Sequence, residues 1–362
     1  MLKPLENRSS LLYPSMQDNL QPLLTAVQRN CHISDARHAG DYTLCVYLLK
    51  MREYFRWEMG YAFHDNLPDG DLGDWLKERE LYWQTIEDES FANLPIAGDS
   101  YDPFDIDALN VALNPHGLIY SGGFGYKHTP HFFLGRLGHI EKQADFTILL
   151  SENEYARDLT APPAMTRNGT IFVRRESLRR MIWEKIEEWQ WNRQENAMAR
   201  AIRGFDFEHN TETALENMTD SVLDSALLHE KGEVLAGKRL GPEWEQMLAD
   251  LPRSKTEIMI RAVRDNLADS LTTLPVLLRK GDDPSLHFFF ANLTNMRKEL
   301  FPSLTRSYEN WVTTGKRNGI EALVSASENH WNRLANQVLV TYRKNSDDFS
   351  DRLNDLIENN KF

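Results

Sequence analysis

The stretch GLIYSGGFGY, residues 117–126, is followed closely by HFFLGRLG, residues 131–138, and the two decide the fold class of this chain. Both are rich in aromatic residues and glycine, and two such runs joined by a short connection predict a pair of strands. DFTILL, residues 145–150, and TIFVRR, residues 170–175, add two strand candidates. Because the connections are short, we predict a small, mostly antiparallel sheet.

The chain on either side of this predicted sheet has helical patterns. Before the sheet, apolar residues recur with helical spacing at Leu20, Leu23, Leu24 and Val27. After it, the chain is almost entirely helical in pattern, with a break expected at Gly232. We therefore predict an α+β, predominantly helical protein, with a mixed domain at residues 1–175 and a helical domain at residues 176–362.

The composition limits the classes of partner and the location. Acidic residues number 54 against 41 Lys plus Arg, which gives a net charge of -13. This charge argues against a nucleic-acid partner, because neutralising phosphates is the main source of such affinity. No stretch has the roughly 20 apolar residues needed to span a bilayer, and residues 1–16 have no pattern of an export signal. We expect a cytoplasmic protein with no membrane partner.

The densest group of reactive side chains is CHISDARHAGDYTLCVYLLKMREYFRWE, residues 31–58. We expect it to form a helix with two faces. At about 100° per residue, a polar face contains His38, Asp41, Tyr42, Cys45, Leu49, Arg52 and Arg56. The second face is apolar and is expected to pack in the core, with Leu44, Leu48, Met51 and Phe55. The alternative is that Asp41 caps the helix and His38 precedes it.

The polar face has the chemistry of a catalytic or binding site. We predict catalytic roles for His38, Asp41, Tyr42 and Cys45, because an imidazole, a carboxylate, a phenol and a thiol can exchange protons or act as nucleophiles. Arg52 and Arg56 are predicted to bind the substrate, because paired guanidinium groups hold carboxylate or phosphate groups by forked hydrogen bonds. The structural alternative is that both arginines form ion pairs with nearby acids, while Cys45 is a small buried residue.

Histidines near the predicted strands indicate a metal site as a further hypothesis. His128 and His131 are three residues apart, and His32 lies in the dense stretch. If these three converge, they would suit iron, zinc or manganese. The alternative is that the two strand histidines make ordinary hydrogen bonds. The signatures HExxH, CxxC, GxSxG and GxxxxGK[ST] do not occur, so no motif of the sequence names a reaction.

These observations support two hypotheses of different class. The first is an enzyme or binding protein for a small anionic or polar molecule, with its site on the polar helix face and the nearby strands. One version of this hypothesis adds a divalent metal on which the activity depends. The second is a non-catalytic helical interaction or scaffold protein, in which the dense stretch forms an internal network of ion pairs. Apolar stripes on the C-terminal helices would favour a homodimer in either case.

Overall fold

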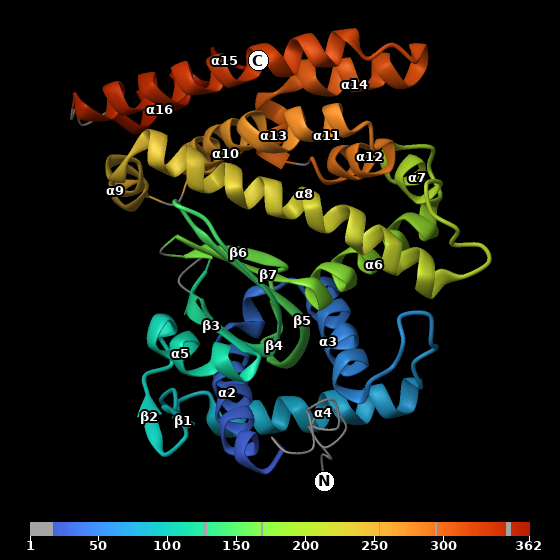
Figure 1. Ribbon diagram of the computed structural model, residues 1–362, viewed down its shortest axis with the longest axis vertical. Helices are drawn as coiled ribbons and strands as arrows, with labels where there is room; N and C mark the ends of the chain where they lie inside the picture. The colour runs from blue at the N-terminus through green and yellow to red at the C-terminus, as the bar shows by residue number, and fades with distance from the viewer. Residues whose placement is uncertain (1–16, 126–128, 168, 253, 294, 345–348) are drawn as a thin grey trace. The chain divides into compact units, whose positions relative to one another are not determined.

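The computed structural model describes residues 17–125, 129–167, 169–252, 254–293, 295–344 and 349–362. It is an α+β fold that is mostly helical, with a five-stranded sheet in the first half and a helical C-terminal half, as predicted (Figure 1). Residue contacts divide the chain into two units. Unit 1 comprises Met1–Gln143, Thr147–Met165 and Phe172–Trp183, and unit 2 comprises Ala144–Phe146, Thr166–Ile171 and Glu184–Phe362. The predicted domain boundary after residue 175 stays a prediction.

The five-stranded sheet has the order β3-β4-β5-β7-β6. Its strands are β3 (Leu118–Phe124), β4 (Pro130–Lys142), β5 (Thr147–Arg157), β6 (Ala164–Arg167) and β7 (Thr170–Arg174). Strand β4 pairs antiparallel with both β3 and β5, and shifts of register interrupt its pairing with β5. Such bulges bend a strand and increase its twist. The short connections of the sequence thus produce the antiparallel pairing that we predicted.

Helix α2 (Gln17–His38) covers this part of the sheet. Its residues Leu23, Leu24 and Val27 are buried in one apolar cluster with Tyr120 and Phe132 of the sheet. Side chains three and four positions apart lie on one side of a helix, so this spacing aligns them toward the strands. The packing fixes which side of α2 faces the start of β4.

Further elements of unit 1 surround this core. They are the short helix η1 (Ala39–Asp41), α3 (Leu44–Met59), α4 (Asp69–Ile86), β1 (Leu94–Ile96), β2 (Asp99–Tyr101), α5 (Ile106–Leu113) and η2 (Asn114–His116), and helix α6 (Arg175–Asn192) begins in this unit. A second apolar cluster contains Trp75 and Trp83 of α4 with Met51 and Phe55 of α3. Unit 1 thus holds one apolar cluster under α2 on the sheet and one among its helices, and a further cluster includes Ile106, Phe133 and Phe172.

The dense stretch forms two helices, which corrects the expectation of one. Helix α2 ends at His38, η1 follows, and α3 begins at Leu44 with Thr43 as its N-cap. Thr43 has extended backbone angles, so the helical hydrogen-bond ladder cannot run through it. The predicted apolar face is also only half right: Met51 and Phe55 are buried, whereas Leu44 and Leu48 are exposed.

Apart from the end of α6 and the segments Ala144–Phe146 and Thr166–Ile171, unit 2 consists of helices with one common apolar core. In chain order these are α7 (Ala197–Ile202), α8 (Thr211–Leu240), α9 (Pro242–Asp250), α10 (Lys255–Ala268), the π-helical turn η4 (Asp269–Thr273), α11 (Leu274–Lys280), α12 (Asp283–Asn292), α13 (Asn295–Leu300), α14 (Pro302–Thr314), α15 (Asn318–Arg343) and α16 (Phe349–Glu358). Among the described residues, no helix is long and apolar enough to cross a membrane. The predicted cytoplasmic location stays a prediction.

Helix α8 continues through Gly232, where we expected a break. A Cβ atom at Gly232 would overlap the carbonyl oxygen of Ala268 and would also press on Thr272. Thr272 donates a hydrogen bond of 2.6 Å to the Leu228 carbonyl of α8. The glycine therefore allows α8 to approach the end of α10 closely, and tertiary packing outweighs the low helix propensity of glycine.

Two glycines of α8 offer a matched test of this packing. We expect Gly232→Ala to lower the free energy of unfolding, because the added methyl group meets backbone that has no room to move. Gly237→Ala is the control, because a Cβ atom there meets nothing within 4 Å. It should raise the stability by up to about 1 kcal/mol. Denaturant unfolding measures both changes, and equal effects of the two substitutions would contradict the close approach.

Candidate functional site

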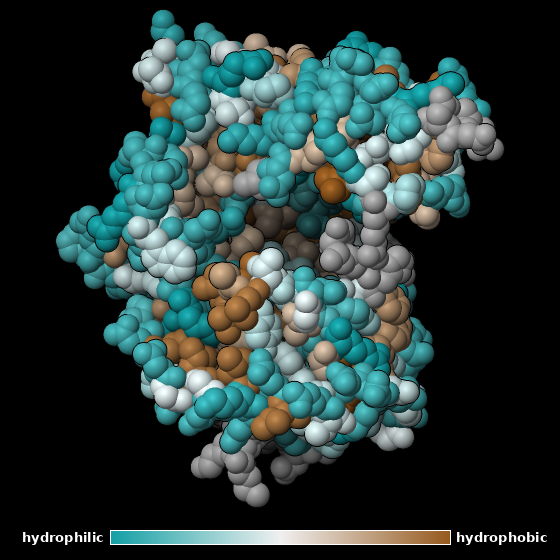
Figure 2. All heavy atoms as spheres, turned by 180° about the vertical axis from the view of Figure 1, so that it is seen from behind, coloured by the Kyte–Doolittle hydropathy of each residue, from teal (hydrophilic) through white to brown (hydrophobic). Residues whose placement is uncertain are grey.

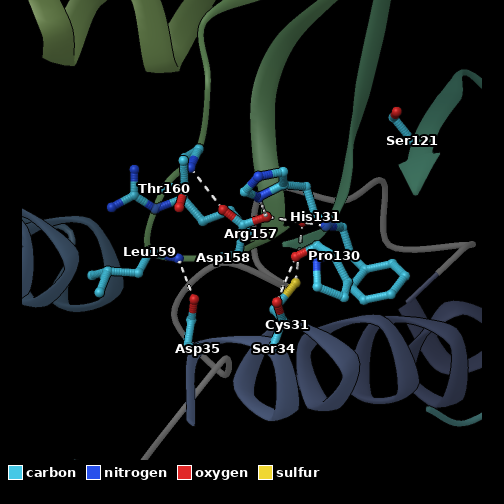
Figure 3. Close-up of polar contacts among 12 residues, drawn as sticks. Cys31, Ser34, Asp35, Ser121, Pro130, His131, Arg157, Asp158, Leu159 and Thr160 are labelled. Atoms are coloured by element: carbon cyan, nitrogen blue, oxygen red, sulfur yellow. Dashed lines mark hydrogen bonds and ion pairs between the residues drawn. The ribbon is translucent and has the colours of Figure 1, made fainter. Parts of the chain in front are cut away.

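The pairing of β4 with β5 brings two polar residues together at one end of the sheet. Phe133 of β4 pairs with Arg157 of β5, so His131, two residues before Phe133, comes beside Asp158, which follows Arg157 (Figure 3). A cavity of about 340 Å³ opens at this place. Its lining residues are Ser34, Asp35, His38, Ala39, Asp41, Tyr42, Lys50, Thr129, His131, Leu159 and Thr160.

Asp158 is the buried anchor of this site. One carboxylate oxygen, Oδ2, accepts a hydrogen bond from the Phe132 amide at 3.0 Å and lies 3.2 Å from Nδ1 of His131. The other oxygen accepts the Ala161 amide at 2.7 Å. Burial by itself would raise the pKa of Asp158, but the charge and hydrogen bond of His131, with Arg174, bring this pKa below its ordinary value. Asp158 is therefore ionised.

Asp35, on helix α2, is a second buried carboxyl group, and its pKa is shifted in the opposite direction. Its Oδ1 accepts a hydrogen bond of 2.9 Å from the Leu159 amide (Figure 3). Its Oδ2 is buried and has no hydrogen-bond partner among the described residues. Burial, and then the charge of Asp158, raise the pKa of Asp35 well above its ordinary value. A raised pKa favours the protonated form of the carboxyl group, and that form can donate a hydrogen bond to a bound molecule.

The pKa values of the two carboxyl groups are thus shifted in opposite directions in one small region. Like charges that lie close together cannot both ionise without cost, so the group with the better partners keeps the charge. Asp158 has two amides and an imidazole, whereas Asp35 has one amide. Pairs of titratable groups whose environments separate their pKa values mark the acid and the base of many catalytic sites.

The second nitrogen of His131, Nε2, lies beside Gly125. Nδ1 faces Asp158, and no described residue forms a hydrogen bond with Nε2. Gly125 lies against the ring edge that contains Nε2, and a Cβ atom at this position would overlap the ring. Glycine at residue 125 therefore leaves room at this edge that any other residue would fill. The nitrogen opposite the carboxylate is the one that can exchange a proton in such a pair.

The turn after Asp158 has a strained backbone. Ala161 is completely buried and has a φ of 39°, in the left-handed region that non-glycine residues seldom occupy. Its amide donates to Asp158, and its carbonyl accepts a hydrogen bond of 2.9 Å from Arg180 of α6. Strain of this kind persists only where surrounding contacts impose it, and it concentrates at functional sites. These two hydrogen bonds hold the turn that carries Leu159 and Thr160.

The remaining lining residues contribute hydroxyl and charged groups. The Tyr42 hydroxyl lies 2.7 Å from Oγ1 of Thr160, and burial raises the pKa of Tyr42, so the phenol stays protonated. The ammonium group of Lys50 lies 5.2 Å from the centre of the Tyr42 ring. Nδ1 of His38 lies 3.6 Å from Asp41, and both side chains are partly exposed. The cavity therefore offers hydrogen-bond donors and charges of both signs.

The structure brings three of the four predicted catalytic residues to the cavity and leaves the fourth outside it. His38, Asp41 and Tyr42 line the cavity, although a break between helices, and not one continuous helix, brings them there. Cys45 is an exposed free thiol and is not among the lining residues, so the expectation that it shares their face does not hold. The first turn of α3 is rotated and displaced by the extended residue Thr43, which separates Cys45 from the residues before the break.

The predicted substrate-binding arginines have protein partners instead. Arg52 donates to Glu53 at 2.9 Å, and Nε of Arg56 lies 3.2 Å from the same carboxylate. Arg56 is buried and also donates to the carbonyls of Ala62 and Asp65 at 2.6 and 3.1 Å. Neither arginine lines the cavity. This is the arrangement that the ion-pair alternative expects, and we leave both arginines out of the candidate site.

The three predicted metal ligands are not brought together. The ring nitrogens of His32 lie 2.7 and 3.1 Å from the guanidinium group of Arg79, and burial, then Arg79, lower the pKa of His32 well below its ordinary value. His131 faces Asp158, and His128 lies outside the described residues. Within the described ranges, no three His, Cys, Asp or Glu side chains form a group that could hold a metal ion. The hypothesis of iron, zinc or manganese therefore gains no support.

Sequence reasoning missed the two carboxyl groups that define the site. Asp35 is within the quoted dense stretch, one position from Ser34, but no motif distinguishes it from the other acids. Asp158 follows a strand that extends well beyond the predicted segment 145–150. Residues 151–157, SENEYAR, have no alternation of apolar and polar side chains, so no local pattern marked the end of this strand or Asp158 after it.

Fold and cavity together define a two-part, mostly helical α+β protein with a polar cavity beside its sheet. The chain belongs to DUF6866, a family of unknown function. The model of the family's N-terminal domain matches residues 22–174, and that of its C-terminal domain matches residues 179–360. No curated protein and no solved structure matches the chain.

The ion pairs of Glu53 generate a stability prediction. Arg56→Ala should lower the free energy of unfolding by about 3 kcal/mol, because it leaves a buried carboxylate and two loop carbonyls with fewer partners. Arg52→Ala is the control and should cost less, because Arg52 is partly exposed and Glu53 retains Arg56. Urea unfolding followed by tryptophan fluorescence measures both. A larger loss for Arg52→Ala would contradict the assignment of Arg56 as the main partner.

The raised pKa of Asp35 generates a prediction about stability and pH. A carboxyl group whose pKa is higher in the folded state stabilises the fold below its unfolded pKa, which is near 3.8. This contribution declines by up to about 1.4 kcal/mol per pH unit until the pH passes the folded pKa. Asp35→Asn keeps a neutral group and should remove this decline. Unfolding free energies measured from pH 4 upward should therefore favour the variant increasingly, and parallel curves would contradict a neutral Asp35.

Proposed function

We propose that this protein is an enzyme that binds a small polar molecule in the cavity of unit 1 and transfers protons on it. One observation carries the proposal: Oδ2 of Asp35 and Nε2 of His131 belong to residues that line the same cavity, and neither atom has a hydrogen-bond partner among the described residues. A buried polar group left without a partner costs free energy, so such groups are retained where a ligand completes their hydrogen bonds. Acid and base groups in this arrangement are typical of general acid–base catalysis.

Asp35 has the role of hydrogen-bond donor in this proposal. Its protonated Oδ2 would donate to a carbonyl or carboxylate oxygen of the bound molecule. When negative charge develops on a carbonyl oxygen, a neutral acid stabilises it strongly, because the surroundings exclude water. Donation by a carboxylic acid that stays neutral near pH 7 is an established way to stabilise such a charge.

The His131–Asp158 pair has the role of base. His131 would accept at Nε2 a proton from the carbon next to the substrate carbonyl, and the electron pair of the broken C–H bond moves toward the oxygen held by Asp35. Asp158 stabilises the positive charge that His131 gains. The proton then returns to carbon, so that no oxidant or second substrate is consumed. The Tyr42 and Thr160 hydroxyls and Lys50 supply contacts that orient the molecule.

The second hypothesis, a non-catalytic interaction protein, keeps one supporting observation. Arg52 and Arg56 form the internal ion pairs that it expects. It gives no role to the buried, unpartnered Oδ2 of Asp35 or to Nε2 of His131. We therefore favour the enzyme, whose site contains both groups, over the scaffold.

Proton transfer can be tested directly by isotope exchange. We expect the full-length protein in D₂O to accelerate exchange of the hydrogens next to the carbonyl in a panel of small ketones and keto acids, followed by proton NMR. Asp35→Asn should reduce the rate at least tenfold, because an amide is a much weaker donor to a developing negative charge. His131→Gln should reduce it at least a hundredfold, because it removes the base.

A histidine on the same strand supplies the control for this test. His139 of β4 is exposed, so His139→Gln should leave the exchange rate unchanged. The rate should also fall as the pH rises through the raised pKa of Asp35, because the donor is then lost. Exchange that is equally fast in the wild type, Asp35→Asn and His131→Gln would refute the proposed function.

A further inference from the structure

A line of close contacts joins α8 to α10 and to the π-helical turn η4, all within unit 2. Thr272 of η4 donates a hydrogen bond of 2.6 Å to the Leu228 carbonyl. A Cβ atom at Gly232 would overlap the Ala268 carbonyl oxygen. Residues 228, 229, 232 and 233 lie on one side of α8, because they recur at intervals of three and four positions. We call these residues, with residues 264, 265, 268, 269 and 272 on the other side of the contact, the α8 seam.

Charged groups line the α8 seam. Nδ1 of His229 lies 2.9 Å from Oδ1 of Asp269, and Oδ2 of Asp269 accepts a hydrogen bond from Arg297. One turn further along α8, Oε2 of Glu233 lies 2.8 Å from a guanidinium nitrogen of Arg264. The hydrophilic side chains that cover much of the C-terminal helices, at the top of Figure 2, are in contact with water, whereas Asp269 is only 2% exposed. Charges in the seam are therefore screened less than charges on the surface.

Glu233 is the carboxyl group of the seam that changes charge near neutral pH. Its Oε1 is buried and accepts no hydrogen bond from the described residues. Burial raises the pKa of Glu233 from 4.5 to about 7; Arg264 opposes this shift, and the charge of Asp265 adds to it. A proton on Glu233 therefore removes a charge that the seam solvates poorly.

We propose that Glu233 is a pH-sensitive switch in the α8 seam: with its proton it lets α8 pack closely on α10, and without it the two helices separate more readily. An ionised Glu233 and the charge of Asp265 repel each other across the contact. Arg264 compensates only in part, because it also holds Glu245 of α9 at 2.6 Å. This inference does not depend on the proposed function, since it uses no residue of the cavity.

The π-helical turn supplies a place where the seam can yield. The Leu274 amide bonds to the Asp269 carbonyl, five residues back, and Pro275 has no amide hydrogen to donate. Single π-helical turns are rare and occur frequently at functional positions. The regular helical hydrogen-bond pattern is already interrupted here, so a small shift of Asp269 and Thr272 disrupts less of it than a shift within α10 would.

The charged groups around Glu233 come from α8 and from four elements near it. They are His229 on α8, Glu245 on α9, Arg264 and Asp265 on α10, Asp269 in η4 and Arg297 on α13. Of these, His229 also has a raised pKa. Burial opposes this shift, but the charge of Asp269 raises the pKa of His229 to about 9.

The two raised pKa values act at different pH. A group whose folded pKa is raised stabilises the fold below its unfolded pKa, and this contribution is lost as the pH rises to the folded value. Glu233 therefore loosens the seam between pH 4.5 and about 7. His229 does so between pH 6.5 and about 9.

Hydrogen exchange of α8 at about pH 5 and about pH 6.5 tests the switch, because Glu233 titrates in this interval while His229 stays protonated. We would measure protection factors, which correct for the pH dependence of intrinsic exchange, in peptides from residues 228–240 of the full-length protein. Opening that releases one proton lowers protection by up to about tenfold per pH unit. We expect a fall of at least about fivefold in the wild type and of less than about twofold in Glu233→Gln, which stays neutral.

Two further variants locate the effect. Asp224→Asn is the matched control and should keep the wild-type fall, because Asp224 is an exposed acid of the same helix whose partner is Lys280. Asp265→Asn removes the opposing charge, so the fall should become smaller and protection at about pH 6.5 should exceed that of the wild type.

Two results would overturn the switch. One is wild-type protection that does not change between the two pH values, and the other is an equal fall in the wild type and in Glu233→Gln. If Glu233→Gln does not fold, Asp265→Asn decides in its place, and an unchanged fall in that variant would overturn the inference.

Discussion

The carboxylate of Asp158 is the contact on which the candidate site depends. It accepts hydrogen bonds from the Phe132 amide of β4 and from the Ala161 amide of the turn after β5, and it faces His131. A single ionised group thus closes the strand pair, bends the following turn and orients the imidazole. Charge-assisted hydrogen bonds are stronger than neutral ones, which explains how they hold Ala161 in an unfavourable backbone conformation. The cavity has its shape because this carboxylate is satisfied entirely by protein groups.

The ionised form of Asp158 also affects the pKa of Asp35. Burial, and then the charge of Asp158 nearby, raise the pKa of Asp35, which has only one amide partner of its own. Helix α2 holds it in place by packing Leu23, Leu24 and Val27 against the sheet, so the orientation of the acid follows from the apolar side of the helix. Packing of apolar residues and the chemistry of the site are therefore linked through one helix. The proposed proton transfer uses the difference between the two carboxyl groups.

Several features could be predicted from local pattern alone. The strand segments of β3, β4, β5 and β7, the helical spacing of Leu23, Leu24 and Val27, and the helical C-terminal half all follow from side-chain periodicity, which is a property of neighbouring residues. Predictions from local pattern were wrong where contacts between residues distant in the chain determine the structure. Gly232 does not end α8, because it faces Ala268, and the dense stretch divides at Thr43 despite its continuous helical pattern. Leu44 and Leu48 fit an apolar face in the sequence, but nothing described packs over them to bury them.

The sequence by itself determined the fold class and directed attention to residues 31–58, which supply His38, Asp41, Tyr42, Asp35 and Lys50 of the cavity. Only the tertiary structure decided which reactive groups are available to a ligand. Arg52 and Arg56 are occupied by Glu53, and His32 by Arg79, whereas Asp35 and His131 each keep an atom without a partner among the described residues. The physical reason is that a side chain's availability depends on burial and, for His32, Asp35 and His131, on partners far away in the chain. Periodicity along the sequence contains no information about those partners.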